Sequence, residues 1–200
     1  MTSFADPAVP ASKTWRIVDA PSPVGLDIDD AAAVWAYAGL SDVQQQDELA
    51  TWGWDDRWAP LFVWLPMLQD DTYVANSLSV AVRDVAAPTS ADVLGAVLVT
   101  MPREGSTDLA HGYVVVRPDE RGAGIGTALL AHGEQVAAAA GRTRFVVRSA
   151  EAPEPPAGPE TLTAPTGAGR VRADAPSSRF ALRHGFALEQ VERYSVLQVS

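Results

Sequence analysis

The sequence predicts a mixed α/β domain, and three patterns support that prediction. Residues 93–100 form a β-branched run that is typical of a strand. Residues 114–116 are three valines in succession, which favours a strand buried on both faces. Residues 127–140 are rich in Ala and Leu and are followed by Gly141, which favours a helix with a glycine stop. Because 47% of the 200 residues are apolar, the chain can build a sizeable core.

The N-terminal part of the chain is expected to contain one strand and a helical region. Pro21 and Pro23 would end the first strand, because proline lacks the N–H group that a sheet uses. Ser41 has the side chain of a helix N-cap, which favours two successive helices, and Pro66 is expected to break a third helical segment. The expected elements are a loose tail at 1–13, a strand at 15–19, helices at 27–40 and 41–51, and helical turns at 55–69.

The following part of the chain is expected to add an antiparallel meander. The strands at 76–83, 93–100 and 109–117 are separated by short turns, which favours antiparallel pairing. Residues 151–176 are rich in Pro, Gly, Ala and Glu, which predicts a long mobile connection inside a single domain at 14–200. The other expected elements are a helix at 127–140, a strand at 144–148, a helix at 177–184 and a last strand at 186–198.

Charge and composition narrow the classes of function. The formal net charge is −10, which disfavours nucleic acid as a partner. This charge suits a cationic partner such as an amine, and simple solubility explains it equally well. The chain has no cysteine, and its three histidines show no short metal-ligand spacing, so no metal site is expected.

Neither the N-terminus nor any apolar run has the features of a membrane or export signal. Residues 1–13 lack the basic start and apolar centre of a secretion signal. The longest apolar run, at 58–68, is too short to cross a bilayer and contains Pro60 and Pro66. These features predict a cytoplasmic protein that does not contact a membrane, as a monomer or a homodimer.

A glycine-rich segment, Arg121–Gly126, lies between the valine strand and the helix expected to follow it. A helix start offers free N–H groups and a positive dipole end, and glycine lets a phosphate approach the backbone. Arg121 adds a cation and Thr127 adds a hydroxyl donor. The spacing matches neither the dinucleotide fingerprint nor a nucleotide P-loop. The segment therefore predicts an anion site, and a glycine-rich turn without a ligand is the alternative.

The wider stretch at 114–130 resembles the acyl-CoA motif of the GNAT superfamily of N-acyltransferases. That motif, Arg/Gln-x-x-Gly-x-Gly/Ala after a strand and a proline, is met at Arg121, Gly124 and Gly126. A second feature of the superfamily, a short helix that ends in Gly-Phe, is met at 179–186. Two motifs in the right order make the resemblance specific.

The resemblance implies a GNAT-like α/β fold, with a central mixed, mostly antiparallel sheet flanked by helices. Its fourth and fifth strands would splay apart, and the pantetheine arm of acetyl-CoA or another acyl-CoA would lie in the gap. The diphosphate would lie on the helix start, and no metal is implied. The residues assigned to the cofactor are Val114, Val116, Arg121, Gly122, Ala123, Gly124, Ile125, Gly126, Thr127 and Ser178.

The positions that often carry catalytic groups in this superfamily are not titratable here. Bases often lie where this chain has Ala110 and Gly112, and a thiolate-protonating tyrosine often lies where it has Ala181. Strand alternation places His111 on the face opposite Ala110, and a purely structural role for this histidine stays open. Without an acid or base, positioning alone can supply about 7–11 kcal/mol. The nearest substitutes are Asp108, His111 and Tyr113.

Residues Trp54, Asp55 and Asp56 fall where the superfamily builds its acceptor site. Aromatic faces and carboxylates suit a cationic amine, and ordinary packing beside an acidic turn is the alternative. The leading hypothesis is direct acyl transfer to an amine of a small molecule or peptide. A non-catalytic acyl-CoA-binding or structural module is the alternative, because residues 185–197 also resemble the first halves of tandem actinobacterial GNAT proteins.

Overall fold

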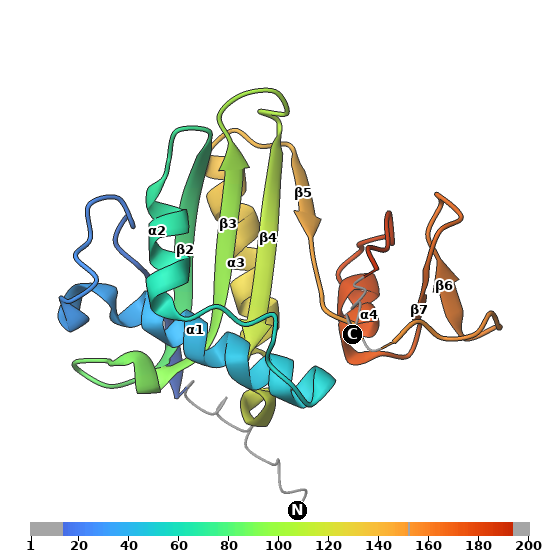
Figure 1. Cartoon of the computed structure of the whole chain (residues 1–200), viewed down its shortest axis with the longest axis horizontal. Helices are drawn as coiled ribbons and strands as arrows, with labels where there is room; N and C mark the ends of the chain where they lie inside the picture. The colour runs from blue at the N-terminus through green and yellow to red at the C-terminus, as the bar shows by residue number, and fades with distance from the viewer. Residues whose placement is uncertain (1–13, 152, 194–200) are drawn as a thin grey trace, which may run out of the picture. The chain divides into compact units, whose positions relative to one another are not determined.

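The structure is a computed structural model that describes residues 14–151 and 153–193. The chain divides into two compact units at the boundary between Arg148 and Ser149. Figure 1 labels the helices and strands of both units. In chain order they are β1 (Trp15–Asp19), α1 (Ala31–Trp52), α2 (Leu61–Gln69), β2 (Val74–Arg83), η1 (Ser90–Asp92), β3 (Val93–Pro102), β4 (Leu109–Val116), η2 (Pro118–Glu120), α3 (Ile125–Ala139), β5 (Arg144–Val147), β6 (Thr161–Thr163), β7 (Arg170–Arg172) and α4 (Pro176–Arg183).

The first unit is built on a five-stranded sheet in the order β1-β2-β3-β4-β5. The first four strands pair antiparallel with their neighbours, and β5 joins β4 in parallel. This topology confirms the expected mixed, mostly antiparallel sheet, including the meander of β2, β3 and β4. A parallel neighbour requires a crossover, and α3 supplies it between β4 and β5.

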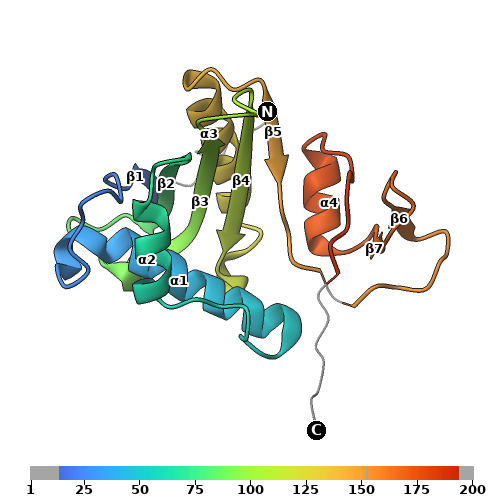
Figure 2. The same ribbon diagram turned by 45° about the horizontal axis from the view of Figure 1, so that its top comes forward.

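Helices cover both faces of this sheet, with α1 and α2 on one face and α3 on the other (Figures 1 and 2). Val115 of β4 packs in the same cluster as Leu40 of α1. Val114 and Val116 pack in the other cluster, which contains Leu129 of α3. The three valines therefore alternate between two apolar layers, as a strand buried on both faces requires.

Helix α1 is continuous over 22 residues, so the expectation of two helices is wrong. The Asp30 carboxylate caps it by accepting from the N–H groups of Ala32 and Ala33 at 3.1 and 3.2 Å. Ser41, the expected second cap, lies inside the helix, and its hydroxyl donates to the Ala59 carbonyl at 3.0 Å. A contact with the chain after α1 therefore uses this hydroxyl, and the helix continues.

Pro66 does not end α2, which continues to Gln69. The helix begins at Leu61, and a proline at its sixth residue removes only one early intrahelical hydrogen bond. Leu65 and Leu68 face the core with 1% and 5% of their surface exposed. Burial of these two side chains holds the short helix against the sheet.

In the second unit, β6 and β7 form a small antiparallel pair, with Leu162 opposite Val171. Part of the segment expected as a connection at 151–176 is therefore a hairpin, and its mobility stays a prediction. The last strand expected at 186–198 is not formed over 186–193, and its remainder lies outside the described residues. The tail expected at 1–13 also lies outside them.

Candidate functional site

One edge of β4 is only partly paired. β3 pairs with six residues of β4, whereas β5 pairs with four, of which Gly112 is the last. The Arg148 N–H then donates to the Gly112 carbonyl at 3.4 Å. Peptide groups alternate along a strand, so those of Val114 and Val116 point toward the same edge as Gly112. β4 and β5 splay apart beyond this point, as expected, and Figure 1 shows the divergence.

Gly112 lies at the point where β4 and β5 begin to diverge, which we call the fork, and it is closely packed. A Cβ atom added to Gly112 would lie 2.4 Å from Cζ of Phe145 on β5. The aromatic ring therefore lies directly over the glycine, on the α3 side of the sheet. Ala110, one pair earlier on the same face, is completely buried. These two positions serve packing, which explains why neither carries a catalytic side chain.

After β4 the chain forms a turn that opens α3. Gly122 and Gly124 have φ angles of 86° and 79°, in the left-handed region that glycine adopts without strain. Gly124 is the N-cap of α3, and no side chain caps the helix. The first helical bond runs from the Ala128 N–H to the Gly124 carbonyl at 3.1 Å, so the preceding N–H groups point out of the helix end. The turn therefore has the backbone geometry of an anion cradle.

The Arg121 side chain lies at the rim between the cradle and the open edge. Its Nε donates to the Val116 carbonyl at 3.2 Å, and its guanidinium pairs with Asp47 of α1. Gly122, Ala123, Gly124 and Thr127 are exposed around it, whereas the Ile125 side chain is buried and anchors the helix start. Ser178, the remaining predicted cofactor residue, is buried in α4 of the second unit, and its assignment stays a prediction.

Asp108, the first of the three catalytic candidates, is committed to an ion pair. The Arg144 Nε donates to its carboxylate at 2.7 Å. This hydrogen bond holds the pKa of the Asp108 carboxyl below its ordinary value. A carboxylate with a lowered pKa is a weak proton acceptor, so the geometry does not favour Asp108 as a base.

His111 and Tyr113 lie on the α1 side of β4, because no register shift interrupts the pairing of β3 with β4. The His111 Nδ1 atom is buried and has no hydrogen-bond partner among the described residues. Burial, and then the charge of Arg148, lower its pKa, so the ring is neutral at pH 7. Burial raises the pKa of Tyr113, as do the nearby carboxylates of Asp47 and Glu48, so its hydroxyl stays protonated.

The predicted acceptor residues lie in the loop that follows α1. The Trp54 ring lies 5.6 Å from the ring of Trp52 at the end of the helix. Asp55 accepts a hydrogen bond from the Gln45 side chain at 2.7 Å, and Asp56 is exposed. The structure therefore brings Trp54 and Asp55 against the last turns of α1.

Two further polar side chains of α1 escaped the sequence prediction. Glu48 is 4% exposed, and its Oε2 atom has no hydrogen-bond partner in the described structure. The Trp52 indole Nε1 is likewise buried and unpartnered there. A signal was present in the sequence, because Glu48 continues the buried row of Tyr37, Leu40 and Gln44 at helical spacing.

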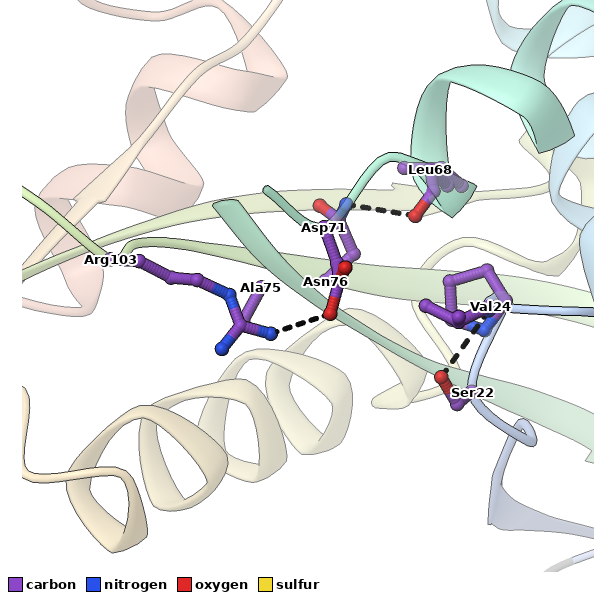
Figure 3. Close-up of a pocket in the computed structure, with 8 residues that line it drawn as sticks. Ser22, Val24, Leu68, Asp71, Ala75, Asn76 and Arg103 are labelled. Atoms are coloured by element: carbon purple, nitrogen blue, oxygen red, sulfur yellow. Dashed lines mark hydrogen bonds and ion pairs between the residues drawn. The ribbon is translucent and has the colours of Figure 1, made fainter. Parts of the chain in front are cut away.

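The first unit also contains two hollows on its α2 side. One, of about 60 Å³, is lined by structural contacts such as the Arg103–Asp71 ion pair at 2.8 Å (Figure 3). In the same view the Asn76 side chain donates to the Leu68 carbonyl at 3.2 Å. A larger hollow of about 400 Å³ lies against α2, β2 and β3 and includes Thr100, which pairs with His111.

Within 14–151 and 153–193, no group of three or more His, Asp or Glu side chains is placed to hold a metal ion. None of the helices that the structure describes combines the length and hydropathy needed to span a bilayer.

Three solved structures are similar to this chain in fold. An aminoglycoside acetyltransferase from an uncultured soil metagenomic sample, in complex with sisomicin, is 15% identical with a TM-score of 0.55, over 93% of this chain and 97% of that one. A tandem GNAT protein from the clavulanic acid biosynthesis pathway is 18% identical with a TM-score of 0.55, over 86% and 43%. The aminoglycoside N-acetyltransferase AAC(6')-Iy in complex with CoA is 12% identical with a TM-score of 0.50, over 96% and 98%.

Sequence comparison gives a more specific result. No curated protein matches the chain significantly. The profile of the acetyltransferase (GNAT) family matches residues 37–157, which include most of α1, the sheet from β2 to β5, and the glycine turn before α3. Because this match covers more than half of the 200 residues, the chain belongs to the acetyltransferase (GNAT) family.

Proposed function

We propose that this chain binds an acyl-CoA, with acetyl-CoA as the first choice, and transfers the acyl group directly to an amine. The observation that supports this most is the continuity of the open β4 edge with the glycine cradle. One end offers strand peptide groups that β5 does not pair, and the other offers helix N–H groups beside Arg121. An extended, amide-bearing chain that ends in a diphosphate matches both parts.

The residues fit this cofactor in two different ways. The peptide groups of Val114 and Val116 would pair with the amides of the pantetheine arm, as an added strand does. The N–H groups from Gly122 to Thr127 would hold the diphosphate, because the glycines there leave no Cβ in the way. Acyl-CoA supplies an activated thioester when bound.

The proposed reaction balances without a metal or a redox partner. The amine nitrogen forms a bond to the thioester carbonyl carbon while the carbon–sulfur bond breaks. The sulfur leaves with the electron pair and takes one proton as the free thiol. A protonated amine must lose one proton before attack, and His111 is a neutral group on the acceptor-facing side of β4 that can receive it.

The acceptor is proposed to be an amine of a small molecule or peptide. Two of the similar structures are aminoglycoside acetyltransferases, whose acceptors are amines, and this supports the class of acceptor. The aromatic and acidic residues Trp54, Asp55 and Asp56 would contact the cation. We place the protein in the cytoplasm as a monomer or homodimer, without metal, nucleic acid or membrane partners.

Isothermal titration with acetyl-CoA tests the binding step. The wild-type chain is expected to bind, and Gly124→Glu is expected to lose binding because it puts a carboxylate in the cradle. Gly105→Glu is the matched control, since Gly105 has a similar φ of 72° in the β3–β4 loop and adds the same charge away from the cradle. Absence of wild-type binding at millimolar acetyl-CoA overturns the proposal.

A non-catalytic acyl-CoA-binding or structural module is the second candidate. The packing of Phe145 over Gly112 favours it, because a common base position is occupied by a structural contact. Thiol release measured over a panel of amines separates the two functions. Release with any amine, lost in Gly124→Glu and kept in Gly105→Glu, excludes the non-catalytic reading, whereas binding without release supports it.

A further inference from the structure

Two polar atoms on one face of α1 have no hydrogen-bond partner. Glu48 Oε2 and Trp52 Nε1 are both inaccessible to solvent, and neither bonds to the other within the described chain. Side chains four residues apart lie on the same face of a helix. A buried polar atom without a partner costs stability, so this pair requires an explanation other than folding.

A hydrogen bond between α1 and α2 shows what a structural arrangement looks like. One turn before Glu48, Gln44 accepts a hydrogen bond from the Trp64 indole N–H of α2 at 2.7 Å. Gln44 and Glu48 are both buried, and Trp52 follows Glu48 by one helical turn. The hydrogen bond of Gln44 joins the two helices, whereas Glu48 Oε2 and Trp52 Nε1 have no partner among the described residues.

The unpartnered pair lies beside the fork of β4. The C-terminal half of α1 crosses β4 and extends past its open edge in both views (Figures 1 and 2). Asp47, next to Glu48, forms the ion pair with Arg121 at the rim of the cradle. Tyr113, the first residue after Gly112, lies within the electrostatic range of Glu48. Glu48 is therefore close to the point where the cofactor edge opens.

A cation already lies at this position. The Arg57 guanidinium carbon lies 5.8 Å from the centroid of the Trp52 ring. Its charge also acts on Glu48, where it opposes the rise in pKa. An aromatic face and a carboxylate around one positive group are the elements of an ammonium site. Arg57 is exposed and comes from the loop after α1, so a substrate cation can displace its side chain.

We propose that Glu48 and Trp52 form the acceptor site of this chain, in which the Glu48 carboxylate takes a proton from a substrate ammonium. The Trp52 indole N–H donates to an oxygen of the same substrate. This assignment rests on the proposed acyl transfer and names its base and acceptor class. In this assignment Glu48, and not His111, accepts the proton of the substrate ammonium.

The two unpartnered atoms, Glu48 Oε2 and Trp52 Nε1, restrict the class of acceptor. Glu48 accepts a hydrogen bond, so its ligand carries an N–H donor. Trp52 donates one, so the same ligand carries a hydroxyl or carbonyl oxygen. Because the two side chains project from one face of the helix, the N–H donor and the oxygen of the ligand lie close together. The acceptor is therefore an amino alcohol, or an amine with a nearby carbonyl.

The surroundings of Glu48 make its carboxylate a stronger proton acceptor than an ordinary glutamate. Burial raises the pKa of its carboxyl, Arg57 opposes that rise, and Asp47 adds to it. From β4, Tyr113 faces it with a protonated hydroxyl. The ammonium gives one proton to Glu48, and its nitrogen then attacks the thioester. The second nitrogen proton leaves with the thiolate as the free thiol.

Steady-state kinetics with acetyl-CoA and an amino alcohol test the proton transfer. Glu48→Gln is expected to lower kcat/KM for the amine by about 10²–10⁴-fold and to remove the acidic limb of its pH profile. The affinity for acetyl-CoA is expected to stay unchanged. Glu134→Gln, which makes the same change at an exposed residue of α3, is the control. Unchanged kcat/KM and pH profile in Glu48→Gln overturn the assignment.

Selectivity tests the role of Trp52. Trp52→Phe keeps an aromatic face and removes the N–H donor. The kcat/KM for an amino alcohol is divided by the kcat/KM for the matched amine without the hydroxyl. We expect this ratio to fall about tenfold in the variant, since a lost neutral hydrogen bond has about that effect. Arg57→Gln is expected to strengthen amine binding. An unchanged ratio in Trp52→Phe overturns the amino-alcohol class.

Two measurements decide the inference without turnover. A raised carboxyl pKa favours the folded state below its ordinary range and loses that advantage as pH rises through the folded value. Glu48→Gln is therefore expected to be at least as stable as wild type at pH 8, while a structural hydrogen bond would make it less stable.

With free CoA bound, wild type is expected to bind ethanolamine more tightly than Glu48→Gln does. Equal binding, or loss of stability, overturns the inference, whereas absent CoA binding overturns the proposed function itself.

Discussion

The two edges of β4 differ in how completely they are paired. On the β3 edge, pairing runs through six residues to Val116. On the β5 edge it stops at Gly112, and the last four residues of the strand are left without a neighbour in the described sheet. The same strand is thus paired within the sheet on one side and open on the other, and we propose that the open side binds the ligand. The open edge arises because the pairing with β5 ends at Gly112.

This difference separates neighbouring residues by the direction of their peptide groups. The peptide groups of Val114 and Val116 point to the open edge, whereas that of Val115 points to β3. Substitutions at Val114 or Val116 should therefore mainly affect binding, whereas a substitution at Val115 should mainly affect stability.

Proline substitution should separate the two edges most strongly. Val115→Pro removes an N–H on the β3 edge and leaves a buried carbonyl unpaired, which costs about 1–3 kcal/mol in addition to ring clashes. We expect it to unfold, as measured by urea denaturation. Val114→Pro should stay folded and bind acetyl-CoA about tenfold more weakly, because one hydrogen bond to the ligand is lost. Equal stability of the two variants would contradict the assigned directions.

Filling the fork should destabilise the sheet. In Gly112→Ala the new methyl group meets Phe145, with a Cβ–Cζ distance of 2.4 Å before relaxation. Overpacking of this kind costs about 1–3 kcal/mol in the free energy of unfolding. Adding Phe145→Leu in the same chain should recover part of the loss. If the double variant is no more stable than Gly112→Ala, the contact with Phe145 does not set the fork.

The cradle should be sensitive to its backbone conformation. Gly122→Ala places a side chain at a φ of 86°, which costs about 1–2 kcal/mol, so the turn is expected to rearrange. Acetyl-CoA affinity measured by titration should fall about tenfold. Gly105→Ala carries the same strain at a φ of 72° in the β3–β4 loop and should lose stability without losing affinity. Equal affinities in the two variants would exclude the cradle.

Removal of the ion pair at the start of β5 should have the smallest effect on stability. The Asp108–Arg144 ion pair is exposed, and exposed pairs contribute little. Because the pKa of Asp108 is lowered, its contribution is present above the ordinary value of 3.8 and is lost as pH falls through the lowered one. Asp108→Asn should lower the Tm slightly at pH 7, and this difference should shrink as the pH falls below 3.8. A loss of activity would return Asp108 to the candidate bases.

Local features of the site could be predicted from the sequence. Glycines at 122 and 124 and the helix after them depend on neighbouring residues, so the glycine turn and the helix start were predicted where they lie. The continuous α1 was missed, because the hydroxyl of Ser41 bonds to Ala59 and does not cap a helix. The hairpin of β6 and β7 was also missed, since three-residue strands leave little periodicity.

The antiparallel meander and the glycine turn could be predicted from the sequence, because they follow from backbone preferences and apolar periodicity within short stretches. The mixed sheet was expected from the family resemblance. The point where pairing with β5 stops, at Gly112, is visible only in the tertiary structure, because it depends on how two strands distant in the chain meet. The tertiary structure also decided that Glu48 is buried without a partner beside β4. Both are outcomes of packing between distant segments, which local sequence cannot specify.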